Sequence, residues 1–199
     1  MGGDVQPSQK SGYDKAQRAA QMLRGEVIDL FAQVEHAVNG VLIHAAALLE
    51  YKTLKPAFPH LLGKKLERLR KLMTEVGPLR AHANRVAPLL DRLASFEELR
   101  RFMAHDVVEV ALKQSGEPIY VFRMDCAPSD GSKDSTLTLM RPDAQSRTAR
   151  LADTVKALVP KLEAITDGMK KPSRHRIIFK SANGGKTDID QPLHTDRDL

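Results

Sequence analysis

Residues 23–48 read LRGEVIDLFAQVEHAVNGVLIHAAAL, and this segment indicates how the whole chain is built. Its apolar side chains recur in steps of three and four residues, at Leu23, Val27, Leu30, Val34, Val38, Val41, Ala45 and Leu48. Because an α-helix turns once every 3.6 residues, these positions form one stripe along a helix. We therefore predict a long amphipathic helix from Tyr13 to about Glu50. Its apolar stripe needs a partner, either another helix of the same chain or a second copy of it.

Further helices are expected in the middle of the chain. An apolar stripe over residues 62–73 predicts a second helix. Pro78 suits the first turn of a third helix, where its missing N–H costs nothing. Ser95 followed by Glu98 has the pattern of a capping box, so a fourth helix is expected to start at about Phe96.

The pattern changes after the fourth helix. Residues 118–124 and 136–140 have strand character and flank a loop at 128–132, which predicts a β-hairpin. A last helix is expected over residues 143–165. The predicted fold class is mainly α: a four- to five-helix bundle with a short β-hairpin inserted before the last helix.

The expected domain organisation is simple. The chain has 199 residues, of which 42% are hydrophobic, and this suits one globular domain. We expect a disordered N-terminus at residues 1–12, a helical domain at 13–166 and a flexible tail at 167–199.

Composition also bears on the compartment. The single cysteine, Cys126, excludes an intramolecular disulfide and favours a reducing environment. The opening residues lack the apolar core of a signal peptide, and the longest apolar run, residues 41–49, is too short to span a bilayer. We expect a cytoplasmic protein without a membrane partner.

Several kinds of site are absent from the sequence. It contains no Walker loop, no dinucleotide-binding glycine pattern and no paired CxxC, and its histidines lack metal-ligand spacing. We therefore expect neither a cofactor nor a bound metal. The formal net charge of +6 permits an anionic partner such as RNA without requiring one.

Residues 96–106, FEELRRFMAHD, hold the candidate catalytic residues. On a helix the apolar residues of this segment share one face, His105 lies almost opposite that face, and Arg100 lies at its rim. Arg101 precedes His105 by one turn. A guanidinium is a permanently charged fork that suits phosphate, and imidazole exchanges a proton near neutral pH. The segment therefore offers a phosphate site, with a solvated helix face as the alternative interpretation.

Arg100 and, after four intervening residues, His105 resemble the R-x(4–6)-H motif of the HEPN superfamily. The surroundings are similar as well: a long first helix, a Gly63–Leu66 segment (GKKL) opening the second helix, then the motif, a hairpin and a closing helix. The resemblance covers roughly residues 13–166. Active members are metal-independent ribonucleases that work as homodimers, with the Arg/His pairs of both protomers lining one cleft. Other members are inactive and act as binding modules.

The resemblance implies roles for the motif residues. RNA would be cleaved by its own 2′-hydroxyl, with His105 as general base or acid. Arg100, helped by Arg101, would hold the phosphate and stabilise charge on its oxygens. Arg101 departs from the family, which usually has Asn, Asp or His there, and Asp106 replaces a common Gly.

Two further arginines, Arg80 and Arg85, form a basic group on the third predicted helix and are candidate RNA contacts. Three functions stay open at this point. The chain is a HEPN-like endoribonuclease of a toxin–antitoxin or other defence system, a non-catalytic HEPN-like dimeric bundle that binds a partner protein or nucleotide, or an unrelated helical interaction module. The partners to expect are a second copy of the chain, RNA, and an antitoxin or other partner protein.

Overall fold

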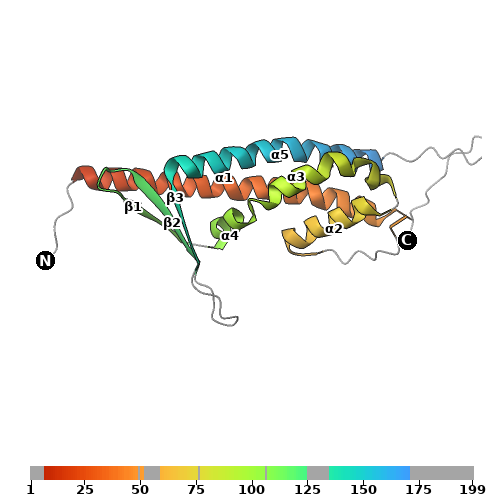
Figure 1. The fold of residues 1–199 in the computed structure, drawn as a ribbon, viewed down its shortest axis with the longest axis horizontal. Coiled ribbons are helices and arrows are strands. Elements are labelled where there is room, and N and C mark those ends of the chain that lie inside the picture. The colour runs from red at the N-terminus through yellow and green to blue at the C-terminus, as the bar shows by residue number, and fades with distance from the viewer. Residues whose placement is uncertain are drawn as a thin grey trace, which may run out of the picture.

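A computed structural model of the chain describes residues 7–48, 50–51, 59–75, 77–105, 107–124 and 135–170 (Figure 1). Its elements follow in the order α1 (Pro7–Ala46), α2 (Leu62–Thr74), the 3₁₀ helix η2 (Pro78–His82), α3 (Ala83–Ala94), α4 (Glu97–His105), β1 (Val107–Leu112), β2 (Pro118–Met124), β3 (Ser135–Met140) and α5 (Arg141–Lys170). The predicted fold class, a mainly helical protein with strands inserted before the last helix, is confirmed.

Two long helices form the spine of the molecule. α1 has 40 residues and α5 has 30, so at 1.5 Å per residue they are about 60 and about 45 Å long. They lie side by side and run in the same direction (Figure 1). Gly40 permits their close approach, because a Cβ there would lie 3.2 Å from Thr166 Oγ1. The apolar stripe of α1 is thus covered in part by the last helix of the same chain.

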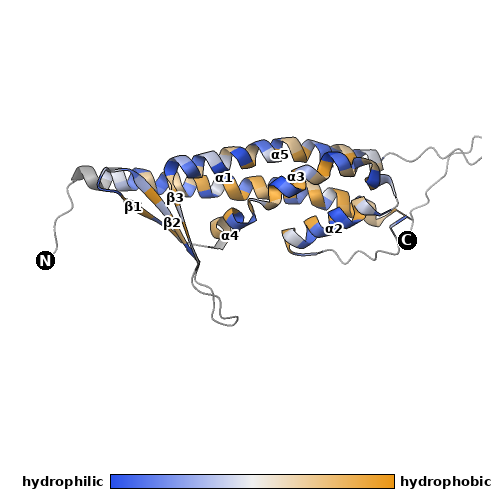
Figure 2. Ribbon diagram, viewed as in Figure 1, coloured by the Kyte–Doolittle hydropathy of each residue, from blue (hydrophilic) through white to orange (hydrophobic). Residues whose placement is uncertain are grey.

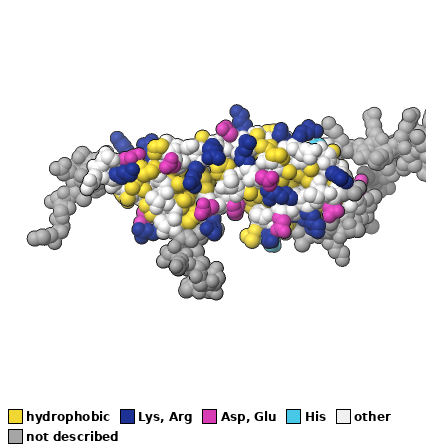
Figure 3. Space-filling model, in the orientation of Figure 1, with side chains coloured by type: hydrophobic (Ala, Val, Ile, Leu, Met, Phe, Trp, Pro, Cys, Tyr) yellow, Lys and Arg dark blue, Asp and Glu magenta, His cyan; other side chains and the backbone are white. Residues whose placement is uncertain are grey.

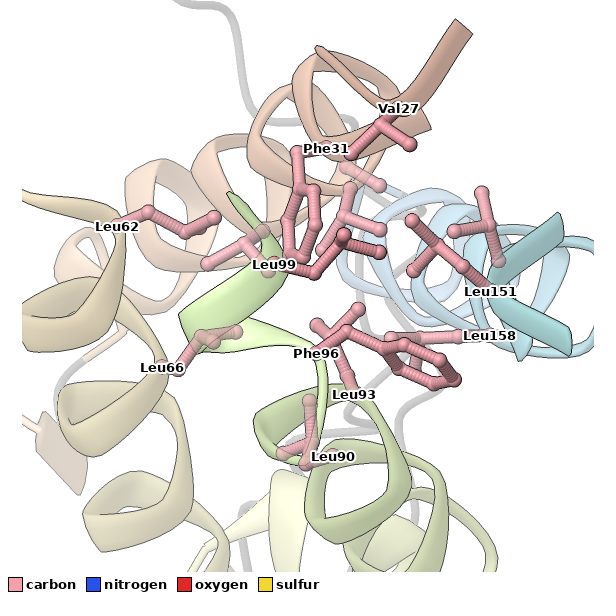
Figure 4. Close-up of a cluster of buried hydrophobic side chains, with 14 of the residues drawn as sticks. Val27, Phe31, Leu62, Leu66, Leu90, Leu93, Phe96, Leu99, Leu151 and Leu158 are labelled. Atoms are coloured by element: carbon pink, nitrogen blue, oxygen red, sulfur yellow. The ribbon is translucent and has the colours of Figure 1, made fainter. Parts of the chain in front are cut away.

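The shorter helices complete the bundle. α2 and α4 pack on α1, and α3 packs on α5. Figure 4 shows the centre of this core, where Phe31 of α1, Phe96 and Leu99 beside and within α4, and Leu151 and Leu158 of α5 point toward one another. Each helix carries hydrophobic and hydrophilic residues along its length, as the hydropathy colouring shows (Figure 2). The amphipathic stripes of the sequence are therefore the surfaces on which the helices meet.

The strands form a three-stranded antiparallel sheet in the order β1-β2-β3, packed against the N-terminal part of α1 (Figure 1). β1 joins β2 through a turn in which Gly116 N–H donates to the Lys113 carbonyl and Gly116 adopts φ +80°. A left-handed residue after such a turn is most easily supplied by glycine. Gln17 Nε2 of α1 donates to the Val108 carbonyl at 3.1 Å and ties the sheet to the helix.

The expected two-stranded hairpin was incomplete. Residues 107–112 follow α4 and pair along their whole length with β2, so the sheet has a third strand before the two predicted ones. Val108 and Val110 are buried and the residues between and after them are exposed, a period of two that only a sheet satisfies. The three β-branched valines of this segment also favour a strand, and pairing with β2 satisfies its backbone hydrogen bonds.

Other boundaries also differ from expectation. α1 begins at Pro7 rather than Tyr13, and α5 continues to Lys170, past the expected start of the tail. Ser95 does not cap α4 as predicted: its hydroxyl donates to the Arg92 carbonyl at 2.7 Å and completes the end of α3. Residues 1–6, Cys126, the predicted loop at 128–132 and residues 171–199 lie outside the described part of the chain. Within that part, no helix is both long enough and apolar enough to cross a membrane.

Candidate functional site

α4 is held on the core by one face. Phe96, Leu99, Phe102 and Met103 are all buried, at 5% exposure or less. Burial of a large apolar side chain contributes about 1.5–3 kcal/mol, so these four residues fix the orientation of the helix. Glu97, Glu98, Arg100 and Arg101 are left at the rim and on the outer face of α4, as the sequence predicted for the two arginines.

Arg100 lies at the rim, between α4 and α1. Its Nη1 donates to Glu97 Oε1 at 2.9 Å, and its guanidinium carbon lies 5.8 Å from the centroid of the Phe31 ring. The side chain is 27% exposed. A ring face attracts a cation, while an i,i+3 ion pair at a partly exposed site is weak. Arg100 is therefore oriented by its neighbours, but an incoming phosphate can compete with Glu97 for it.

Arg101 is exposed on the outer side of α4, with its guanidinium 5.6 Å from the centroid of the neighbouring Phe102 ring. Within the described residues it takes part in no ion pair. Its charge is thus open to an anion from solvent.

His105 is the last residue of α4. Its side chain, and all of Asp106, lie outside the described residues, so the predicted acid–base group is placed only by its position at the helix end. Helical periodicity puts position 105 one turn beyond Arg101 on the same face, and about 140° around the helix from Arg100.

Arg24 of α1 binds the C-terminal end of α4. Its Nε donates to the Met103 carbonyl at 2.7 Å and its Nη2 donates to the Ala104 carbonyl at 3.4 Å. The last carbonyls of a helix have no partner within it and carry partial negative charge, which a cation stabilises. Arg24 therefore fixes the helix turn just before His105. No pattern in the sequence predicts this contact, because the partners are 79 and 80 residues apart.

The two other predicted RNA contacts lie elsewhere. Arg80 is on η2 and Arg85 is on α3, and both are exposed. Arg85 lines a groove between α3 and α5, and no residue of α4 lines that groove. The structure thus brings Arg24, Arg100 and Arg101 to the surroundings of α4, and it does not bring Arg80 and Arg85 to them.

A second hollow, of about 350 Å³, lies between α1 and α5. His36 and His44 of α1 and Glu163 and Asp167 of α5 line it. His44 Nδ1 lies 2.9 Å from the Gly40 carbonyl, and Asp167 pairs with Lys170 at 3.1 Å. Among the described residues, no group of three or more His, Cys, Asp or Glu side chains has an arrangement that could hold a metal ion.

The charges on the surface are mixed. Figure 3 shows basic and acidic side chains interspersed over the face in view, with hydrophobic side chains between them. A site for an anion must therefore come from a local arrangement of cations rather than from a broad positive face. In comparisons with known proteins, no family model, no curated protein and no solved structure matches this chain.

Proposed function

We propose that this chain is a HEPN-like domain that binds RNA and cleaves it without a metal ion, at the Arg100, Arg101 and His105 positions of α4. One observation carries the proposal. α4 is fixed on the core by its apolar face and at its end by Arg24, and it presents two guanidinium groups at its solvent boundary directly before a histidine. The order of elements supports the same proposal, because a long first helix, a second helix, the motif, strands and a closing helix follow one another along the chain.

The proposed reaction uses the RNA's own 2′-hydroxyl. His105 takes the 2′-proton, the 2′-oxygen bonds to phosphorus, and the bond from phosphorus to the 5′-oxygen breaks. The leaving 5′-oxygen takes up a proton, and the products are a 2′,3′-cyclic phosphate and a 5′-hydroxyl end. The guanidinium groups stabilise the charge that develops on the phosphate oxygens.

The helix geometry favours a homodimer for this reaction. Arg100 and His105 are about 140° apart around α4, so one helix does not direct both at the same phosphate. Two copies related by a two-fold axis would place Arg100 of one copy near His105 of the other, and two-fold pairing is the commonest assembly of soluble proteins. A toxin or defence ribonuclease of this kind would act in the cytoplasm and be inhibited by an antitoxin covering α4.

The second candidate is a non-catalytic HEPN-like bundle that binds a partner protein or a nucleotide. The contacts of Arg100 favour the partner protein over a ligand that carries phosphate: the guanidinium is already engaged by Glu97 and by the Phe31 ring. An arginine with those partners has less to gain from a phosphate than a free one.

The test is RNA cleavage by purified protein with EDTA present throughout. His105→Ala should lower the rate by about 10²- to 10⁴-fold, the usual effect of losing a general acid or base. Arg100→Ala and Arg101→Ala should weaken RNA binding and turnover. Arg147→Ala is the matched control for Arg101→Ala, because Arg147 is also exposed but lies on α5.

Each outcome separates the candidates. Cleavage that leaves 2′,3′-cyclic ends and is lost in the His105 variant supports the ribonuclease. Wild-type protein that binds RNA and never cuts it favours the binding module. Cleavage that persists in His105→Ala means that the site is wrong, and a monomer mass by light scattering at micromolar concentration argues against the shared cleft.

A further inference from the structure

A groove of about 380 Å³ lies between the η2–α3 segment and α5. α5 contributes one continuous face to it, from Lys156 to Ile165, and the other wall is formed by His82, Arg85 and Val86. Pockets that take small ligands start at about this size. No residue of α4 lines the groove, so it is separate from the site proposed for RNA cleavage.

Every ionisable side chain that lines the groove is basic. These are His82, Arg85, Lys156 and Lys161. Arg85, Lys156 and Lys161 are exposed at the rim, and none of them takes part in an ion pair within the described residues. Asp153 is one turn before Lys156 on α5 but does not line the groove. Three permanent positive charges around one hollow, without a carboxylate in its lining, favour an anion there.

The floor of the groove is apolar. It is made of Val86 from α3 and of Pro160, Ile165 and two alanines from α5. Contact with these side chains removes apolar area of a ligand from water. Inorganic phosphate alone would leave this surface unused.

We propose that this groove binds a small organic phosphate with a flat, apolar ring system. The phosphate would lie among Arg85, Lys156 and Lys161, and the rings would lie on the floor around Pro160. A ligand with a charged end and an apolar ring body would use both the cations and the apolar lining of the groove, whereas a phosphate alone or a ring alone would use only one of them. The inference does not depend on RNA cleavage at α4.

The test is a titration of the full chain with 1-naphthyl phosphate, followed by ligand fluorescence and by amide chemical shifts. Inorganic phosphate and 1-naphthol, each of which lacks one half of the probe, are the ligand controls. Wild-type protein should bind the complete probe more tightly than either half, with shifts confined to η2, α3 and the second half of α5. Added salt should weaken binding, because exposed charges are screened.

Lysine variants test whether the positive charges of the groove contribute to binding. The double variant Lys156→Gln with Lys161→Gln should weaken binding about tenfold, as expected for lost charge-assisted hydrogen bonds. Lys156→Arg with Lys161→Arg should retain binding, and Lys71→Gln, an exposed lysine of α2, should not change it. Glutamine, arginine and lysine have similar helix propensities, so α5 should fold in all of them.

Three results would overturn the proposal. Binding of naphthyl phosphate no tighter than that of inorganic phosphate would mean that the floor contributes nothing. Equal affinity in the double glutamine variant would mean that the ligand binds elsewhere. Single-stranded RNA that binds through these lysines far more tightly than the probe would assign the groove to RNA and not to a small ligand.

Discussion

Lys64 and Lys65 are neighbours in the sequence, and the fold gives them opposite surroundings. Lys65 is buried, and its Nζ donates to Glu35 Oε1 of α1 at 2.6 Å. Lys64 pairs with Glu67 on the same helix, with both side chains about two-thirds exposed or more. Removing Glu35 takes a carboxylate away from a buried ammonium group, whereas an exposed pair contributes little.

We therefore predict different costs for the two pairs. Glu35→Ala should lower the free energy of unfolding by about 2 kcal/mol, and Glu67→Ala by less than about 0.5 kcal/mol. Urea unfolding followed by circular dichroism measures both. Equal costs would mean that Glu35 is not an important partner of Lys65.

Tyr51 joins the end of the α1 segment to the start of η2. It is 2% exposed, and its hydroxyl oxygen accepts a hydrogen bond from the Leu79 N–H at 3.0 Å. A Cβ at Gly77 would lie 2.5 Å from this oxygen, so the position requires glycine. Burial raises the pKa of Tyr51 above 10.0, against the lowering effect of the hydrogen bond from Leu79.

The raised pKa predicts a loss of stability in alkali. The folded protein holds the Tyr51 proton more tightly than the unfolded chain does, so the contribution is complete below pH 10.0 and is lost as pH rises through the folded pKa. Tyr51→Phe leaves the buried Leu79 N–H unpaired and should cost about 1–3 kcal/mol near neutral pH. The difference between wild type and Tyr51→Phe should narrow above pH 10.0. A constant difference up to about pH 11 would contradict the assignment.

Two glycines of α1 show how packing changes the effect of replacing glycine by alanine in a helix. A Cβ at Gly25 would meet nothing within 4 Å, while one at Gly40 would lie 3.2 Å from Thr166 Oγ1 on α5. Glycine in a helix interior is less stable than alanine by about 1 kcal/mol. An alanine at position 25 should therefore stabilise the protein by this full amount. An alanine at position 40 would require Thr166 of α5 to move.

Gly25→Ala should therefore raise the free energy of unfolding by about 1 kcal/mol, and Gly40→Ala should gain clearly less or lose stability. Thermal and urea unfolding of both variants provide the measurement. If Gly40→Ala stabilised the protein as much as Gly25→Ala, the close packing of α1 on α5 at Thr166 would be wrong.

At the scale of the whole molecule, the described elements share one core. A single cluster of buried residues extends from Ala16 near the start of α1 to Ile165 near the end of α5, and it includes residues of the sheet. α1 passes through the entire cluster. We therefore expect the sheet and the α2–η2 part of the bundle to unfold together.

Three tyrosines allow this to be tested. Tyr120 is buried in the sheet, Tyr51 is buried near η2, and Tyr13 is exposed on the first turns of α1. In protein labelled with fluorotyrosine, the ¹⁹F resonances of Tyr51 and Tyr120 should lose their native shifts at the same urea concentration. Distinct midpoints for the two would show that the sheet and the bundle are separate cooperative units.

The helices, the two strands of the predicted hairpin and the buried face of α4 could all be predicted from the sequence. Those features are local: a stripe of period 3.6 or an alternation of period two is present in the residues themselves. The same helical period that identifies the buried face of α4 also predicts that Arg100 lies at its rim. The role of the Arg100 and His105 positions remains a prediction.

Features that need partners distant in the sequence could be seen only in the tertiary structure. β1 became a strand because β2 pairs with it, Lys65 became buried because Glu35 lies opposite, and Arg24 reached the end of α4 across 79 residues of chain. The basic groove likewise requires α3 and α5 to meet. A local pattern predicts which side of an element is apolar, but it does not predict which other element covers that side. The free energy of these contacts arises only when the chain has brought both elements together.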